Sequence, residues 1–166
     1  YSEQEYLMPL TMAVRDDRIA YKTTEGVVCL NSHTGKKLWK TTSPTPQTRP
    51  GFSAPTLVLA DGVVLCADRK LGSIDNANGP INWGVGGWGT GKAPRNAETI
   101  LRAYDLETGN KLWTAPCSEH YNAQVDLFVL GNTVYPSTRF AGYDLQTGDK
   151  VDQLDQHSPP VSMGHH

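Results

Sequence analysis

The sequence predicts an all-β protein built from repeated four-stranded antiparallel sheets. Three observations carry this prediction. A turn motif containing Thr-Gly recurs along the chain, a further pair of short apolar segments precedes each copy, and no stretch shows the 3.6-residue apolar period of a helix. Because the apolar segments are short and separated by polar turns, they are typical of strands.

The repeated motif is best preserved at residues 102–113, where it has the spacing Asp-x-x-Thr-Gly-x-x-x-Trp. Its defining residues in this copy are Asp105, Thr108, Gly109 and Trp113. The other two copies supply the matching residues Thr34, Gly35, Trp39, Asp144, Thr147 and Gly148. The first copy has Asn31 in place of Asp, and the third has Asp152 in place of Trp.

The chemistry of this motif is that of a hairpin turn. An Asp side chain accepts backbone N–H bonds at the start of a turn, and the Gly four positions later supplies a positive φ without steric cost. Upstream of each copy, a polar turn joins another strand pair: residues 11–14 and 19–21, 56–59 and 63–67, and 127–130 and 133–135. Each unit therefore reads as four antiparallel strands.

The spacing of the copies favours a β-propeller. Thr-Gly begins at residues 34, 108 and 147, so the intervals are 108 − 34 = 74 and 147 − 108 = 39 residues. One propeller blade takes about 40 residues, so the shorter interval is a plain repeat and the longer one carries an insertion. A β-sandwich also has short strands, but it would not repeat this motif at this spacing.

This motif resembles the pyrroloquinoline-quinone-like (PQQ-like) repeat of the quinoprotein alcohol dehydrogenases and of the outer-membrane-assembly propeller lipoproteins. The resemblance covers about residues 8–160. In that family the motif Trp packs between neighbouring blades, so the resemblance gives Trp39 and Trp113 a structural role. Asp152 puts the docking of the third blade in question.

We expect a partial propeller of about three blades. They lie at residues 8–40, 53–116 and 123–154, with the insertion at 71–99. Residues 158–161 resemble residues 53–56, which open the second blade, so a fourth blade is expected to begin near 158. Propellers close with about four to eight blades. The expected partner is therefore the remainder of the propeller, in the same or another chain.

Composition excludes several classes of function. The net charge is −2 without a run of like charges, so neither a nucleic acid nor a membrane surface is an expected partner. No apolar stretch approaches the roughly 20 residues that span a bilayer. Cys29, Cys66 and Cys117 fit neither a disulfide framework nor a zinc ribbon, and the first two are expected to be small apolar strand residues.

Functional residues are expected at one end of the blades. In a four-stranded blade the Thr-Gly turns lie at one end, and the insertion and the connections between blades lie at the other. The candidates for binding a protein or carbohydrate ligand at this loop-rich end are Trp83, Trp88, Arg95, His120, Tyr121 and His157. The alternative role of Trp83 and Trp88 is to cap a blade edge or to pack on a neighbour.

Other groupings carry weaker hypotheses. The Cys117-x-x-His120 spacing, with His157 on an adjacent connection, is compatible with metal ligation, against a solvated His and a half-buried Cys. Gly-rich residues 84–91 lack the Gly-Lys-Ser/Thr ending of a phosphate loop. His165 and His166, read as native residues, are candidates for a site at the channel end.

Three functions follow from these features. The first is a periplasmic or extracellular binding and scaffolding module, a location implied by the resemblance alone. The second is part of an enzyme, either quinoprotein-like or a polysaccharide lyase using His120, Tyr121, His157 and Arg95 as catalytic groups. The repeat does not itself imply bound PQQ, and no adjacent Cys pair occurs. The third is a rigid spacer in a multidomain protein.

Overall fold

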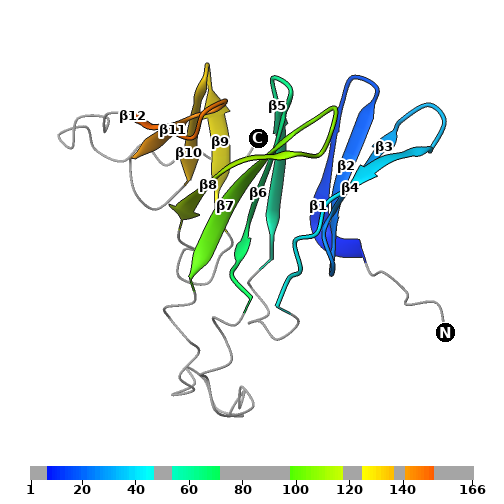
Figure 1. The fold of residues 1–166 in the computed structure, drawn as a ribbon, viewed down its shortest axis with the longest axis horizontal. Coiled ribbons are helices and arrows are strands. Elements are labelled where there is room, and N and C mark those ends of the chain that lie inside the picture. Colours follow the sequence, from blue (N-terminus) through cyan, green and yellow to red (C-terminus); the bar gives the residue numbers. More distant parts are fainter. Residues whose placement is uncertain (1–6, 47–53, 72–97, 118–124, 137–140, 152–166) are drawn as a thin grey trace, which may run out of the picture.

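Three four-stranded antiparallel sheets follow one another along the chain (Figure 1). The computed structural model describes residues 7–46, 54–71, 98–117, 125–136 and 141–151. The described residues contain strands and turns and no helix. The predicted all-β fold of about three four-stranded blades is confirmed, and we call the sheets blades 1, 2 and 3 in chain order.

Each blade is a simple meander in which consecutive strands pair. Blade 1 consists of β1 (Leu7–Arg15), β2 (Arg18–Thr23), β3 (Val27–Asn31) and β4 (Lys37–Lys40). Blade 2 consists of β5 (Thr56–Ala60), β6 (Val63–Arg69), β7 (Thr99–Asp105) and β8 (Lys111–Cys117). Blade 3 consists of β9 (Leu127–Leu130), β10 (Thr133–Pro136), β11 (Gly142–Asp144) and β12 (Lys150–Val151).

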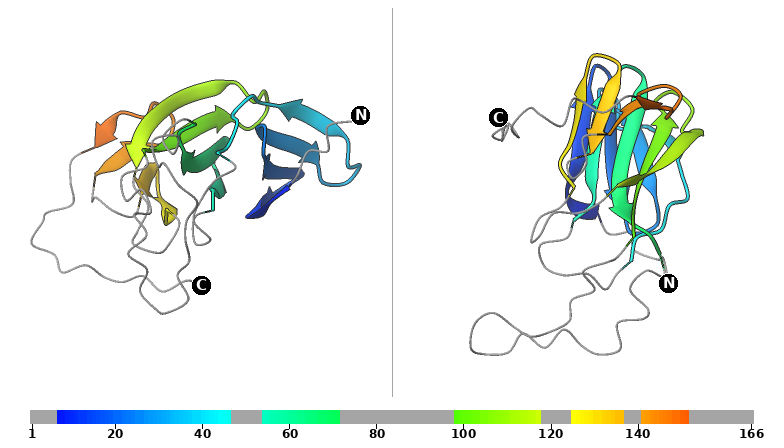
Figure 2. Two further views of the ribbon diagram at one scale, coloured as in Figure 1. Left: turned by 90° about the horizontal axis from the view of Figure 1, so that it is seen from below. Right: turned by 90° about the vertical axis from the view of Figure 1, so that its left-hand side faces the viewer.

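The blades stand side by side, and their first strands β1, β5 and β9 are neighbours (Figures 1 and 2). Apolar side chains fill the two spaces between them. The cluster between blades 1 and 2 contains Cys29, Trp39, Leu57, Cys66 and Tyr104, and both cysteines have no exposed surface. A second cluster, which includes Trp113, joins blades 2 and 3. The core thus lies between sheets, as expected for units that bury their faces against neighbours.

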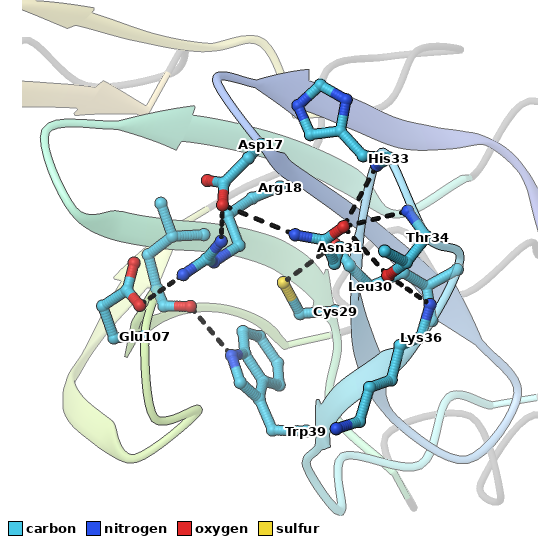
Figure 3. Close-up of polar contacts among 11 residues, drawn as sticks. Asp17, Arg18, Cys29, Leu30, Asn31, His33, Thr34, Lys36, Trp39 and Glu107 are labelled. Carbon is cyan, nitrogen blue, oxygen red and sulfur yellow. Dashed lines mark hydrogen bonds and ion pairs between the residues drawn. The ribbon is translucent and has the colours of Figure 1, made fainter.

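The three Thr-Gly turns share one geometry. The Oδ1 atom of Asp105 accepts hydrogen bonds from the backbone N and the Oγ1 of Thr108, each at 2.7 Å. Asn31 Oδ1 does the same for Thr34, at 2.9 Å to both donors (Figure 3). Asp144 Oδ1 accepts from the backbone N of Thr147 at 2.8 Å. Because Asn carries the same acceptor as Asp, the first copy keeps the turn.

The turns of blades 2 and 3 are each covered by the Trp of the preceding blade. Trp39 Nε1 donates a hydrogen bond to the carbonyl of Leu106 at 2.8 Å, drawn as the dashed line from the labelled Trp39 in Figure 3. A Cβ atom on Gly109 would lie 2.7 Å from the Trp39 ring. Trp113 Nε1 donates to the Leu145 carbonyl at 2.9 Å, and a Cβ on Gly148 would lie 2.5 Å from its ring. Glycine is therefore required at these turns both for positive φ and for space.

A β-bulge directs each Trp toward the next blade. In blade 1 the register shifts so that Cys29 pairs with Trp39 while Leu30 pairs with Lys37, and blade 2 repeats this shift at Ala103 and Tyr104. An extra residue in one strand re-aims the side chains that follow it.

Blade 3 lacks this shift in its described strands. Tyr143 pairs with Lys150, and Gly142 pairs directly with Val151. A Cβ atom on Gly142 would lie 2.7 Å from Val151 Cγ2 and 2.5 Å from Thr133 Cγ2. Val151 thus occupies the strand position that Trp39 and Trp113 take in the other blades. Asp152, aligned with Trp by sequence, lies outside the described residues.

The Trp contact predicts different costs at two matched glycines. Gly109→Ala and Gly35→Ala place a Cβ at similar positive φ values, 73° and 67°, so both lose about 1–2 kcal/mol of unfolding free energy. Of these two glycines, only Gly109 faces a Trp ring. The overlap of the new Cβ with that ring is expected to lower the unfolding free energy by a further roughly 1–3 kcal/mol. Urea denaturation of both variants measures the difference, and equal losses would contradict the Trp contact.

Protonation of the turn aspartates should destabilise the protein in acid. The hydroxyl and backbone N–H of Thr108 lower the pKa of Asp105, and the backbone N–H of Thr147 chiefly lowers the pKa of Asp144. A lowered folded pKa contributes stability above the unfolded value of 3.8, and this contribution is lost as pH falls through the folded pKa.

The matched test replaces both carboxyls with the amide that blade 1 already uses. The variant with Asp105→Asn and Asp144→Asn should show a shallower fall of unfolding free energy below about pH 4 than the original chain. Urea denaturation at steps from pH 7 to pH 2 measures the two slopes. Parallel slopes would show that these carboxylates do not contribute to acid sensitivity.

Candidate functional site

The two ends of the blades carry different kinds of connection. In blade 2, Arg69 pairs with Thr99, and Thr99 pairs with Cys117, so these residues mark one end of the sheet. Asp105 and the Thr-Gly turn mark the other end. We call the first the connection end and the second the turn end. The chain that follows Leu71 and the chain that follows Cys117 both leave from the connection end (Figure 1).

Most residues proposed from the sequence lie outside the described part of the chain and stay predictions. They are Trp83, Trp88, Arg95, His120, Tyr121, His157, His165 and His166. The one described member of the proposed metal-ligand set is Cys117, the half-buried last residue of β8. The described residues contain no group of three or more His, Cys, Asp or Glu placed to hold a metal ion.

The stem of the long blade 2 connection is well defined. The backbone N of Lys70 donates to the carbonyl of Glu98 at 2.8 Å, and Lys70 Nζ lies 2.9 Å from Glu98 Oε2. The exposed ion pair itself contributes little. The backbone bond extends the ladder of β6 and β7 by one residue pair beyond Arg69 and Thr99. The two ends of the connection are therefore held side by side on a paired strand end.

A buried polar cluster lies beside this stem, between blades 1 and 2. Its charged members are Lys22 of β2 and Asp68 of β6, whose side chains are 0% and 1% exposed, with Nζ and Oδ2 3.8 Å apart. Lys22 Nζ donates to the carbonyl of Ser43, and Thr45 Oγ1 donates to Asp68 Oδ2. The backbone N of Arg69 donates to Asp68 Oδ1 at 2.8 Å. We call Lys22, Ser43, Thr45 and Asp68 the connection cluster.

The connection cluster fixes the segment that leads from blade 1 to blade 2. The backbone N atoms of Ser43 and Thr45 donate to the carbonyls of Glu25 and Thr24 at 2.8 and 2.9 Å, so this segment runs along the β2–β3 turn. A Cβ atom on Gly26 would lie 1.8 Å from the carbonyl oxygen of Thr41, so only glycine permits this approach. The path of the chain up to Pro46 is thus set by buried contacts.

Sequence reasoning missed this cluster. Asp68 follows the apolar run of β6, and Lys22 occupies a buried position of β2; a charged residue at an inward position of a strand is a recognisable signal. Their pairing depends on the placement of two blades, and 46 positions separate them in the chain (68 − 22 = 46). The cluster is a rigid base for the connection end.

The three cysteines, all described, form no disulfide. Burial raises the pKa of the Cys29 thiol. No helix in the described ranges is long and apolar enough to cross a membrane.

Successive four-stranded antiparallel blades, locked by a Trp of one blade on the Thr-Gly turn of the next, define this chain as part of a PQQ-like β-propeller. The model of one such family, described as outer membrane protein assembly factor BamB, matches residues 7–165. The chain belongs to this family.

Solved structures share the fold at low sequence identity. A quinohemoprotein alcohol dehydrogenase from Pseudomonas putida HK5 matches 86% of this chain with a TM-score of 0.51 and 12% identity. The computationally designed Ika4 protein matches 94% with a TM-score of 0.50 and 13% identity. BamB from Moraxella catarrhalis matches 84% with a TM-score of 0.48 and 20% identity.

The chain spans only part of the natural structures that it matches. The matched share is 38% of the Moraxella BamB chain, 26% of the Pseudomonas dehydrogenase and 76% of the designed Ika4 chain. A comparison with the sequences of curated proteins finds no match.

The buried pair of the connection cluster should be sensitive to single substitutions. Asp68→Leu leaves the ammonium of Lys22 buried without this carboxylate, so we expect a loss of about 3–5 kcal/mol in unfolding free energy. The combined variant Lys22→Met and Asp68→Leu removes both charges and should recover much of that loss. Urea denaturation of the two variants measures the recovery. A double variant as unstable as Asp68→Leu alone would contradict charge pairing as the reason.

Proposed function

We propose that this chain is part of a periplasmic or secreted scaffolding propeller that binds protein partners through its connection end. The observation that carries the proposal is the family match over residues 7–165, because that family is described as an assembly factor for outer membrane proteins. The partner class that follows is a protein of outer-membrane assembly.

The geometry of the turn end supports this choice of end. Several of its polar side chains contact a neighbouring blade: Arg15 Nη2 lies 2.8 Å from Asp61 Oδ1, and Arg18 Nη2 lies 2.5 Å from Glu107 Oε2 (Figure 3 draws the second pair). Gln146 Nε2 donates to the carbonyl of Asp61 at 3.0 Å. These contacts join blades 1, 2 and 3 in series. Groups used to join blades are less available to a partner.

The connection end supports the proposal because it carries long connecting segments on a fixed base. There the blades end in a buried cluster and a paired stem, and long segments of chain leave from them. Loops held on a rigid base are where binding residues gather. The predicted residues Trp83, Trp88 and Arg95 belong to the connection that follows Leu71. Aromatic and Arg side chains are enriched among the residues that dominate protein interfaces.

The test removes this connection without disturbing the blade. Because Lys70 and Glu98 are already bonded across the stem, residues 72–97 can be replaced by a short Asn-Gly turn. We expect this variant to unfold at an unchanged urea concentration and to lose capture of outer-membrane assembly proteins from a solubilised bacterial envelope. Mass spectrometry of the captured proteins, for the original and variant chains side by side, measures the loss.

A variant at the opposite end is the control. His33→Ala and Lys36→Ala change exposed residues of the blade 1 turn and should leave capture unchanged. Capture that survives removal of residues 72–97 but is lost in the turn-end variant would move the binding surface to the other end. A chain that captures no assembly protein in any form would overturn the proposed function and favour a rigid spacer.

A further inference from the structure

At both interfaces between blades, a tyrosine of the following blade faces the preceding one. Tyr104 of β7 and Tyr143 of β11 each stand directly before the Asp that opens a Thr-Gly turn. Strand register agrees with this match, because Val64 pairs with Tyr104 as Val134 pairs with Tyr143. The two side chains therefore leave equivalent positions on equivalent faces of blades 2 and 3.

Tyr143 contacts blade 2 through both its ring and its hydroxyl. The ring lies beside that of Trp113, with ring centroids 6.3 Å apart. The hydroxyl donates a hydrogen bond to the carbonyl of Pro116 at 3.2 Å. Pro116 is the last residue but one of β8, so this bond is made where the chain leaves blade 2 at the connection end.

Tyr104 reaches the end of blade 1 from within the apolar cluster between blades 1 and 2, where it is 3% exposed. Burial raises the pKa of Tyr104, and the hydroxyls of Ser43 and Thr41 oppose this rise, so both lie close to the phenol oxygen. Ser43 Oγ is itself buried, and none of the described atoms meets it at full hydrogen-bond geometry. The Tyr104 hydroxyl is thus the neighbour that supplies a buried polar atom with a partner.

Both hydroxyls reach the same short stretch of the preceding blade. Thr41 and Ser43 follow Trp39 by two and four residues, and Pro116 follows Trp113 by three. Each interface is therefore tied in two directions. A Trp reaches forward to the turn of the following blade, and a Tyr reaches back to the start of the connection that leaves the preceding blade.

Neither the turn nor apolar packing requires this hydroxyl. In blade 1 the residue before Asn31 is Leu30, and this blade forms the same Thr-Gly turn. A phenol oxygen buried between sheets costs free energy unless it is hydrogen-bonded, so an apolar residue is the simpler choice for this position. Tyr at the matching position of blades 2 and 3 thus points to a polar role at the interface.

The stretch that Tyr104 contacts is held to blade 1 by backbone bonds. The backbone N–H groups of Thr41, Ser43 and Thr45 donate to carbonyls of the β2–β3 turn and of Val27. The side chain of Thr45 also bonds Asp68 of blade 2. Tyr104 adds a tie to blade 2 before that point, next to the last strand of blade 1.

We propose that Tyr104 and Tyr143 are positioning residues for the connection end. From the following blade, each hydroxyl holds the first residues of a connection and so sets the direction in which that connection continues. His120 and Tyr121, two predicted binding residues, come within five residues of Pro116 in the sequence. The consequence for partner binding rests on the proposed function, whereas the positioning itself does not.

Two substitutions remove the hydroxyls and keep the rings: Tyr104→Phe and Tyr143→Phe. Each should loosen one connection and leave the other unchanged, because each hydroxyl contacts one connection only. The matched control is Tyr135→Phe. Tyr135 follows Val134 in β10 and therefore points to the opposite face of blade 3, where its ring stacks on Phe128.

Amide hydrogen exchange followed by NMR measures the connection that leaves blade 1. In Tyr104→Phe, the amides of Thr41, Ser43 and Thr45 should exchange roughly two- to tenfold faster, the range that one lost hydrogen bond supplies when amides exchange by local opening. In Tyr143→Phe and Tyr135→Phe these amides should exchange at the original rate. Unchanged exchange in Tyr104→Phe overturns the proposal, and so does an equal rise in all three variants, which general destabilisation produces.

Thiol labelling measures the connection that leaves blade 2. Cys117 is half-buried and adjacent to Pro116, whereas Cys29 and Cys66 have no exposed surface. Labelling of Cys117 should be roughly two- to tenfold faster in Tyr143→Phe, for the same reason, and unchanged in Tyr104→Phe and Tyr135→Phe. A labelling rate that Tyr143→Phe does not change overturns the positioning role of Tyr143.

Titrating each chain against a solubilised bacterial envelope tests the consequence for binding. Tyr104→Phe and Tyr143→Phe should raise the chain concentration needed for half-maximal capture of assembly proteins by at most about tenfold, because the partner must restore the original path. Tyr135→Phe should not. Loosened connections with unchanged capture would overturn the role in binding. If the original chain captures nothing, the proposed function fails, and exchange and labelling still decide the positioning.

Discussion

The hydrogen bond from a Trp indole to the turn of the next blade is the interaction on which the rest of the structure depends. One blade of four short strands cannot bury both of its faces, so its stability comes from its neighbours. Trp39 and Trp113 each bury a large ring in the space between blades and satisfy a backbone carbonyl that the ring would otherwise desolvate. The turn glycine is the other half of this contact, since any side chain there would displace the ring.

The position of that ring is set by strand register, which the repeat motif does not reveal. In the sequence alignment of the repeats, Asp152 stands at the position of Trp39 and Trp113. From the sequence alone, this difference predicts a weaker contact between the third blade and its neighbour. The structure gives a different reason for the change. Without the bulge, Gly142 pairs with Val151, and Thr133, Tyr135 and Val151 crowd the space above Gly142. At this position the third blade has Val151 in place of a Trp with its indole N–H donor. The same face of the blade carries the stacked rings of Phe128 and Tyr135.

What could be predicted from the sequence is what local chemistry determines. Alternating apolar residues and turns such as Asp61-Gly62 locate strands, because side-chain direction and φ are set within a few residues. The Lys22–Asp68 pair depends on how two blades pack, and no local pattern specifies a partner 46 positions away. The predicted binding residues of the connections form no regular pattern, so residue types such as Trp83 and His120 indicate chemistry and leave geometry open.

The two ends of the blades thus differ in what restricts their sequence: contacts within and between blades at the turn end, and the paired strand ends at the connection end. At the turn end, each of Asp105, Gly109 and Leu106 has a partner in its own turn or on a neighbouring blade, so substitutions there act first on assembly of the sheet stack. At the connection end, the described ladder of β6 and β7 runs to the backbone bond between Lys70 and Glu98, and the length of chain between these two residues is not set by the ladder. A repeat architecture can therefore keep its blade-to-blade lock while the segments beyond the stem change. Binding specificity in such a protein is expected to follow those segments rather than the blades.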